Sequence, residues 1–554
     1  MEAPLKNLTS STFARYSLLV LLLFSVACTQ GSPPKKGDEA NGQTAAPHNP
    51  AKEPKGAKDP PVPSKLDNKP QPPKEDNLTP TSQLLSDPAE WTRRLNHPPS
   101  PTLQPEKRAH ALVELARMAR WSGRYDAAIA HAQQALMAIE SANSPLEPYI
   151  FELARCYQAN LDIAKAQEQY DRLVLSTTDY WKYAGHIGLA EMDLDEQRDK
   201  SARKHLDGIP GIDSEELFGA DALNPRRLAV LAQIHLLDGE MELAWSTMKD
   251  LIKSVRDQFE EHPFPLAPFL YKGGLIALVM GDVATARELL GEALLIQESA
   301  FPTGHPFTAE IINQLALATM TTGDMDEAER LFKRAIAMLE ATLFEKHPAL
   351  SSPLNNLGEL YRVQEEYEVA SELLARAVEI DQEAFGNKHP RAAASLSNLA
   401  FLLESVGDLE QAEALHQAVL EIQEKAHGPE HPTVAAALNN LAGLYLTVEE
   451  GEEARKLYQR AVTILEKSAG ENHISTATAS LGLAQACQAM KDYDTARKLF
   501  SRSLKTYVDA FGEKSTQVGA TLLTWAQMEE EAGNTEKAQE LLNQATSILE
   551  NLQR

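Results

Sequence analysis

The apolar positions along most of the chain recur at the spacing of short amphipathic helices. Between Pro353 and Val363 apolar and small residues follow one another at intervals of three and four, and the same spacing returns between Val369 and Ile380. Residues 365–367 separate the two stretches and have the polar character of a turn. Such a pair of helices cannot bury both apolar faces by itself, so each pair must stack on the next one.

This pattern returns with a period of 42 residues, which is typical of a repeat architecture. A His-Pro pair and a turn glycine recur at the same step, although Glu365, Glu449 and Lys491 replace the glycine in three units. One small residue of the second helix returns in eight units: Ala244, Ala286, Ala328, Ala370, Ala412, Ala454, Ala496 and Ala538.

Leu357-Gly358 and Tyr361, followed by Ala370 and Ala377, form a pattern that resembles the tetratricopeptide repeat. The 42-residue period and the segment that begins at His431 are similar to the kinesin-light-chain-like variety of this family. The resemblance covers roughly residues 263–549, and three looser units precede them. It implies an all-α fold, an α-solenoid in which about eleven helix pairs wind into a right-handed superhelix, with the first helix of each pair on the concave face.

Four segments follow from these patterns: 1–27 as a signal peptide, 28–105 as a disordered Pro-rich tether, 106–220 as irregular repeats and 221–554 as regular repeats. The tether interpretation rests on composition, because 17 of the 32 prolines lie between residues 30 and 105 and aliphatic residues are scarce there. Such a segment buries too little apolar surface to offset its ordering entropy and acts as an extended spacer.

The uncharged run from Tyr16 to Ala27 is shorter than the roughly 20 residues of a spanning helix and fits the hydrophobic part of a signal peptide, although a short anchoring helix is the alternative. Its end, Ser25-Val26-Ala27-Cys28, resembles a bacterial lipoprotein signal, in which the cysteine is lipidated. Ser25 departs from the usual leucine and also permits ordinary cleavage. We expect a lipid anchor at Cys28 in the bacterial cell envelope, on the periplasmic or surface side, with secretion as the alternative.

Charge and motifs exclude several classes of function. The chain has 79 acidic and 53 basic residues, a formal charge of -26, which argues against nucleic-acid binding. Three cysteines are too few for a disulfide framework or a zinc cluster. No motif of a hydrolase, metalloprotease or dinucleotide enzyme occurs. We therefore expect no catalytic activity, no cofactor and no small-molecule substrate.

The recurring His-Pro pairs permit two interpretations. They offer imidazoles for a metal, but histidines in successive repeats should lie at least a helix-packing distance of about 8–10 Å apart, too far to share one zinc ion. Proline is well suited to the first turn of a helix, where the missing N–H has no partner to lose. We favour the second interpretation, in which the histidine closes the loop between repeats, and expect no metal site.

Binding residues are expected on the inward face of the first helices, because the resemblance implies that ligands contact the position two residues before the Leu of each Leu-Gly or Leu-Ala pair. In four consecutive repeats this position holds Asn313, Asn355, Ser397 and Asn439. Asparagine is a poor helix former, and its amide can both donate and accept hydrogen bonds with an extended peptide. Docking between repeats is the alternative, which we favour for the neighbouring column of Asn356, Asn398 and Asn440.

Basic residues on the inward face are few. The chaperone adaptors of this family hold a peptide carboxylate with Lys and Arg, and the central repeats offer only Arg362, beside Glu359 and Glu404. A second group, Arg117, Arg120 and Arg155 near Trp121, is a candidate for an acidic segment or consists of solvated helix arginines.

These observations predict an exported, lipid-anchored scaffold that binds an extended peptide or protein partner in its concave groove. The alternative is a structural subunit of a cell-envelope assembly that uses its convex surface or its ends, where Ile548 and Leu549 lie near the last residues without a polar capping helix.

Overall fold

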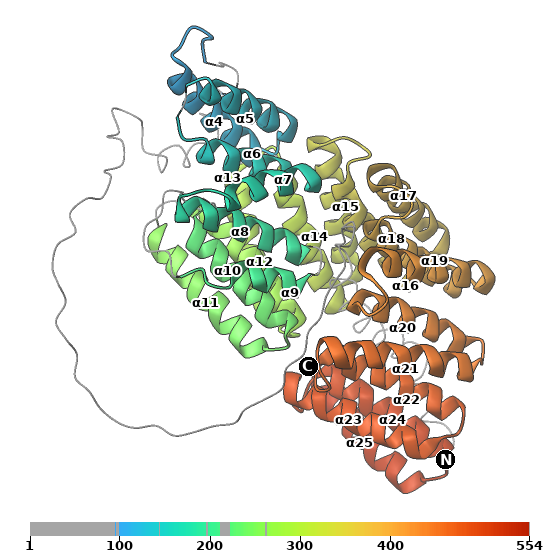
Figure 1. The fold of residues 1–554 in the computed structure, drawn as a ribbon. Coiled ribbons are helices and arrows are strands. Elements are labelled where there is room, and N and C mark those ends of the chain that lie inside the picture. Colours follow the sequence, from blue (N-terminus) through green and yellow to red (C-terminus); the bar gives the residue numbers. More distant parts are fainter. Residues whose placement is uncertain are drawn as a thin grey trace, which may run out of the picture.

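The protein is an array of helical hairpins in a computed structural model that describes residue 95 and residues 99–142, 144–195, 198–210, 222–260 and 263–552 (Figure 1). Helices α4 to α25 form eleven consecutive hairpins, and no strand occurs among the described residues. The expected all-α solenoid of eleven helix pairs is confirmed.

The helices of the first three hairpins are uneven in length, from 8 residues in α9 to 17 residues in α4 and α8. Their bounds are α4 (Pro105–Trp121), α5 (Tyr125–Glu140), α6 (Glu147–Ala159), α7 (Ile163–Val174), α8 (Asp179–Asp195) and α9 (Asp199–Leu206). Leu95, inside the segment predicted as tether, is helical and packs beside Leu115, Met118 and Phe301, so it belongs to the folded body.

The other eight hairpins follow the 42-residue period. Their bounds are α10 (Leu223–Leu237), α11 (Met241–Gln258), η2 (Phe264–Leu266), α12 (Ala267–Val279), α13 (Val283–Ala300), α14 (Pro306–Thr321), α15 (Met325–Thr342), η3 (Pro348–Leu350), α16 (Ser351–Val363), α17 (Tyr367–Phe385), α18 (Pro390–Val406), α19 (Leu409–His427), α20 (Pro432–Thr447), α21 (Gly451–Ser468), α22 (Ile474–Ala489), α23 (Tyr493–Phe511), α24 (Thr516–Glu531) and α25 (Thr535–Leu552).

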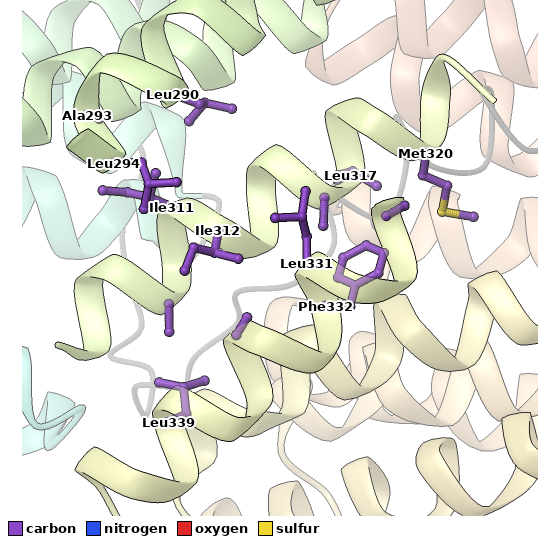
Figure 2. Close-up of a cluster of buried hydrophobic side chains, with 14 of the residues drawn as sticks. Leu290, Ala293, Leu294, Ile311, Ile312, Leu317, Met320, Leu331, Phe332 and Leu339 are labelled. Atoms are coloured by element: carbon purple, nitrogen blue, oxygen red, sulfur yellow. The ribbon is translucent and has the colours of Figure 1, made fainter. Parts of the chain in front are cut away.

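Small residues let the two helices of each hairpin approach one another. Seven of the eight alanines in register are fully buried, and Ala538 in the last hairpin is 8% exposed. At Gly358 a β-carbon would lie 2.7 Å from Leu374 Cγ, so only glycine fits opposite that leucine. Between α13, α14 and α15 the core is apolar, with Ile312, Leu331 and Phe332 directed into the same interface (Figure 2).

Each hairpin turn that the structure describes in full contains a residue with positive φ. Gly281, Gly323 and their equivalents supply it with φ near 80°, whereas Glu365, Glu449 and Lys491 adopt φ of 65°, 63° and 62°. The replacements noted in the sequence therefore keep the left-handed backbone without the freedom of glycine. The helix that follows the turn often begins with an aspartate cap, as at Asp324.

Hairpins far apart in the sequence meet because the superhelix winds back onto itself. The turn of the first hairpin touches the start of the sixth, where a β-carbon on Gly123 would lie 2.5 Å from Pro306 Cδ. The end of α10, in the fourth hairpin, meets the tenth, where His473 Nε2 donates to the Leu237 carbonyl at 3.0 Å. Successive turns of the superhelix are thus in direct contact.

Candidate functional site

A cavity of about 480 Å³ lies where the N-terminal and central hairpins face one another. Most of its wall comes from the first helices of their hairpins, in particular α6, α8, α12, α14, α16 and α18, as expected for a concave face. Its polar lining consists of Tyr125, Gln158, Asp195, Tyr271, Glu310, Asn313, Gln314, His347, Ser351, Ser352, Asn355, Asn356, Asp381, Arg391 and Ser395.

Asn313 and Asn355 line this cavity, as expected for ligand-facing positions, but both also bond to the next repeat. Asn313 Nδ2 donates to Ser352 Oγ at 3.2 Å, and its Oδ1 accepts from Asn356 Nδ2 at 3.1 Å. Asn355 Nδ2 donates to Ser395 Oγ at 2.8 Å. Docking between repeats therefore uses both polar atoms of the Asn313 amide and one of those of Asn355, and Asn356 docks as expected for its column.

The remaining oxygen of Asn355 has no partner. Ser351 Oγ and Ser395 Oγ each donate to Asp381, both at 2.5 Å, which uses the single proton of each hydroxyl. Ser395 Oγ can then only accept from Asn355, and this determines the orientation of the amide. Asn355 Oδ1 is left without a hydrogen-bond partner although the side chain is only 5% exposed.

Asn313, Asn355, Ser397 and Asn439 form one column along the first helices, and its last two members, Ser397 and Asn439, lie beyond the cavity. Ser397 is half-buried and donates to the Ala393 carbonyl of its own helix. Asn439 is half-buried, and neither Nδ2 nor Oδ1 of its amide has a hydrogen-bond partner. Asn439 thus keeps its full capacity for a ligand, and the binding role of all four residues stays a prediction.

The arginines singled out in the sequence form ion pairs with neighbouring carboxylates. Arg120 Nε lies 2.8 Å from Glu152 Oε1, and Arg117 bonds to the same fully buried carboxylate. Arg155 contacts Glu191 at 3.3 Å. Arg362 forms a bidentate pair with Glu359 and also donates to Ser405. These contacts stabilise the packing of first helices, and they leave less capacity for an acidic ligand.

The histidines of the His-Pro series cap the first helices, so the helix-start interpretation is confirmed. In each case Nδ1 accepts from the backbone N–H two residues later, at 2.9 Å for His305 and at 3.1 Å for His347. The same cap recurs at His389, His431 and His473. Burial lowers the pKa of His305 to about 4, and the backbone of Trp121 offsets this only in part. A neutral ring suits an acceptor, because the protonated ring has no lone pair left.

Sequence analysis missed the acidic side chains of the cavity. Glu310 Oε1 accepts from Tyr271 Oη at 2.7 Å, and burial raises the pKa of Glu310. Burial also raises the pKa of Asp195 to about 6 and raises that of Asp381. Glu310 precedes Asn313 by three residues, so it lies on the same helix face and was accessible to reasoning. Asp195 belongs to a distant hairpin and gave no such signal.

Several other expectations concern the rest of the chain. Cys156 and Cys487 are buried free thiols. Leu549 was expected to form part of an uncapped apolar surface near the chain end. This is wrong, because Leu549 is only 8% exposed and packs against Gly519. The signal peptide and Cys28 lie outside the described residues. Among the helices of the described residues, none combines the length and apolarity that a membrane span requires.

A family model matches the regular repeats of this chain. The family model described as tetratricopeptide repeat matches six overlapping segments: 270–341, 308–383, 349–417, 391–467, 433–507 and 475–551. Together they cover half of the chain, and no curated protein was found to match it.

Solved structures similar to this chain include several helical repeat proteins. One is a kinesin light chain of Podosopora anserina with nearly identical TPR-like repeats, 27% identical, covering 37% of this chain and 97% of that one with a TM-score of 0.32. BtubC from P. vanneervenii is 21% identical and covers 42% and 91%, with a TM-score of 0.34. Yeast Tom70 is 17% identical and covers 80% and 92%, with a TM-score of 0.42.

Proposed function

Because the chain belongs to the tetratricopeptide repeat family, whose members bind protein or peptide partners and are generally non-catalytic scaffolds, we propose that it binds an extended peptide in its concave groove. The groove would run along the first helices, past Asn313, Asn355, Ser397 and Asn439. The amide of Asn439 carries the proposal, because both of its polar atoms are buried without a partner. A buried polar group without a hydrogen bond costs about 1–3 kcal/mol, which a bound peptide backbone would recover.

The same geometry ranks the residues of the column. Asn439 loses no protein contact when a ligand binds, and Asn355 offers one unused oxygen. Asn313 would have to exchange its bonds to Ser352 and Asn356 for bonds to the ligand. We therefore place most of the binding contribution of this column at Asn439 and Asn355.

Export and anchoring form the second part of the proposal. Support comes from the sequence, in which a short apolar run ends at Cys28 and a Pro-rich segment follows. A lipid on Cys28 would hold the repeats at a membrane through a spacer. Cys28→Ala should move the protein from the membrane fraction to the soluble fraction of lysed cells, and a wild-type protein found only in the soluble fraction contradicts the anchor.

The groove is tested with one variant and a matched control. Asn439→Ala should leave thermal stability unchanged or slightly higher, because it removes no bond of the protein and alanine favours the helix. Partner affinity should fall by about 0.5–1.5 kcal/mol, roughly two- to twelvefold. Asn543→Ala, on the exposed face of α25, makes the same change outside the groove; it removes only a solvent-exposed bond from Gln539, so stability should again change little and partner affinity should not change.

Partners for this test would be captured from detergent-solubilised cells with the wild-type chain, identified by mass spectrometry and titrated by calorimetry. A partner that binds both variants as tightly as the wild type would refute the groove. It would favour the alternative, in which convex or terminal surfaces form an envelope assembly.

A further inference from the structure

The polar walls of the cavity present hydrogen-bond acceptors in excess. Carboxylates of Asp195, Glu310 and Asp381 line it, whereas Arg391 is the one cationic side chain among the lining residues described. His347 also lines it, but burial lowers its pKa and its Nδ1 is occupied as a cap. The walls are therefore negative.

Two lining side chains have acceptor oxygens without partners. Asn355 Oδ1 is one, on a side chain that is 5% exposed, and Gln314 Oε1 is the other. The bonds of Ser395 to Asp381 and Asn355 determine that Oδ1 is the unpartnered atom of the Asn355 amide. A ligand group at this place would therefore have to donate a hydrogen bond. Both vacancies call for a ligand that donates hydrogen bonds.

Of the three carboxylates, Glu310 is the most accessible, Asp195 is half-buried, and Asp381 is buried and already accepts from Ser351 and Ser395. The side chain of Glu310 contacts solvent inside the cavity, where the surrounding hairpins shield it from bulk water and so raise its pKa, and one of its oxygens accepts from Tyr271. Lys272, whose charge lowers the pKa of both Asp195 and Glu310, donates to Gln233, which is not among the lining residues. A cation inside the cavity would meet negative charge and unused acceptors together.

We propose that this cavity binds the cationic side chain of a lysine or arginine carried by the peptide in the groove. The inference rests on the proposed function and adds the chemistry of one ligand residue. Ammonium and guanidinium groups donate several hydrogen bonds and accept none, which matches the walls. Bonds between a charged donor and a carboxylate are about twice as strong as neutral ones.

The proposal makes binding dependent on pH. Burial raises the pKa of Asp195 to about 6; Lys272 and Arg391 lower it, and Glu191 and Glu310 raise it. Burial raises the pKa of Glu310 as well, against the opposing effects of Tyr271 and Lys272. As the pH falls through about 6 Asp195 loses its charge, and Glu310 loses its charge at a higher pH than an ordinary glutamate, while a lysine ammonium keeps its own, so affinity should decrease on acidification.

Nα-acetyl-lysine amide is a suitable probe, with Nα-acetyl-norleucine amide as its uncharged counterpart. For a ligand of this size we expect a dissociation constant on the order of 1 mM, measurable by saturation-transfer NMR on the full chain. The norleucine probe should bind at least about fivefold more weakly, and lysine-probe affinity at pH 5 should be about fivefold lower than at pH 7.5.

Glu310→Gln removes one cavity charge with little change in shape and should weaken the lysine probe about fivefold. Glu379→Gln makes the same change on the exposed side of α17 and should have no effect. Equal binding of the two probes, or an unchanged affinity in Glu310→Gln, would overturn the inference. If these results occur while Asn439→Ala still weakens a captured partner, the groove function stands and only the cationic specificity is wrong.

Discussion

Ser395 joins three helices of two adjacent repeats, α16, α17 and α18, through one hydroxyl, and its replacement tests whether this buried network stabilises the array. The hydroxyl is fully buried, donates to Asp381 at 2.5 Å and accepts from Asn355 at 2.8 Å. Ser395→Ala removes a bond to a carboxylate, about 1.5–3 kcal/mol, and a neutral bond, about 0.5–1.5 kcal/mol. The expected loss is about 2–4.5 kcal/mol, less a few tenths for the better helix propensity of alanine.

A matched control lies two residues away on the same helix. Ser397 bonds only to the Ala393 carbonyl of its own helix, so Ser397→Ala should change stability by no more than about 0.5 kcal/mol. A repeat array need not unfold in one step, so a single melting temperature is an incomplete measure. Hydrogen exchange should show faster opening of α16, α17 and α18 in Ser395→Ala, with distant hairpins less affected.

Equal protection of these helices in both variants would refute the reasoning. It would mean that the apolar contacts of the hairpins hold the repeats together and that the serine and asparagine bonds are exchanged for water without loss.

Three further predictions concern the hairpin-turn residues, the protonation of His305 and the number of repeats. Replacing Glu365, Glu449 or Lys491 by glycine should stabilise the protein by about 0.5–1 kcal/mol each in denaturant titrations, because their positive φ strains any side chain; a loss of stability would contradict this. The pKa of His305 falls from an ordinary 6.5 to about 4 on folding, so its contribution, at most about 3 kcal/mol, is present above pH 6.5 and is lost as pH decreases toward 4. His305→Asn keeps a cap without titrating, and its melting temperature should fall less between pH 7 and pH 4.5 than that of the wild type. Deleting residues 348–389 should preserve helicity per residue in circular dichroism but lower the melting temperature, because contacts between superhelical turns lose their register; a collapse of helicity would contradict a solenoid.

The sequence by itself determined the local architecture. It predicted the number of hairpins, the buried alanine of the second helix, the turn residues and the His-Pro helix starts. These features depend on contacts within one repeat or between neighbouring repeats, so the 42-residue period displays them directly. The placement of Asn313 and Asn355 on the cavity wall followed from their position in the first helix. Their bonds to Ser352 and Ser395 did not, because side-chain pairing depends on rotamers and on the exact offset of adjacent hairpins.

Only the tertiary structure decided which distant hairpins meet. The small rotation between one hairpin and the next accumulates over five or six units before Gly123 reaches Pro306 and Leu237 reaches His473. A slight change in that rotation would separate the turns and open the cavity, so no local pattern predicts it. Asp195 and Glu310 line one cavity for this reason: 115 positions apart in the chain, they are brought together by the pitch of the superhelix.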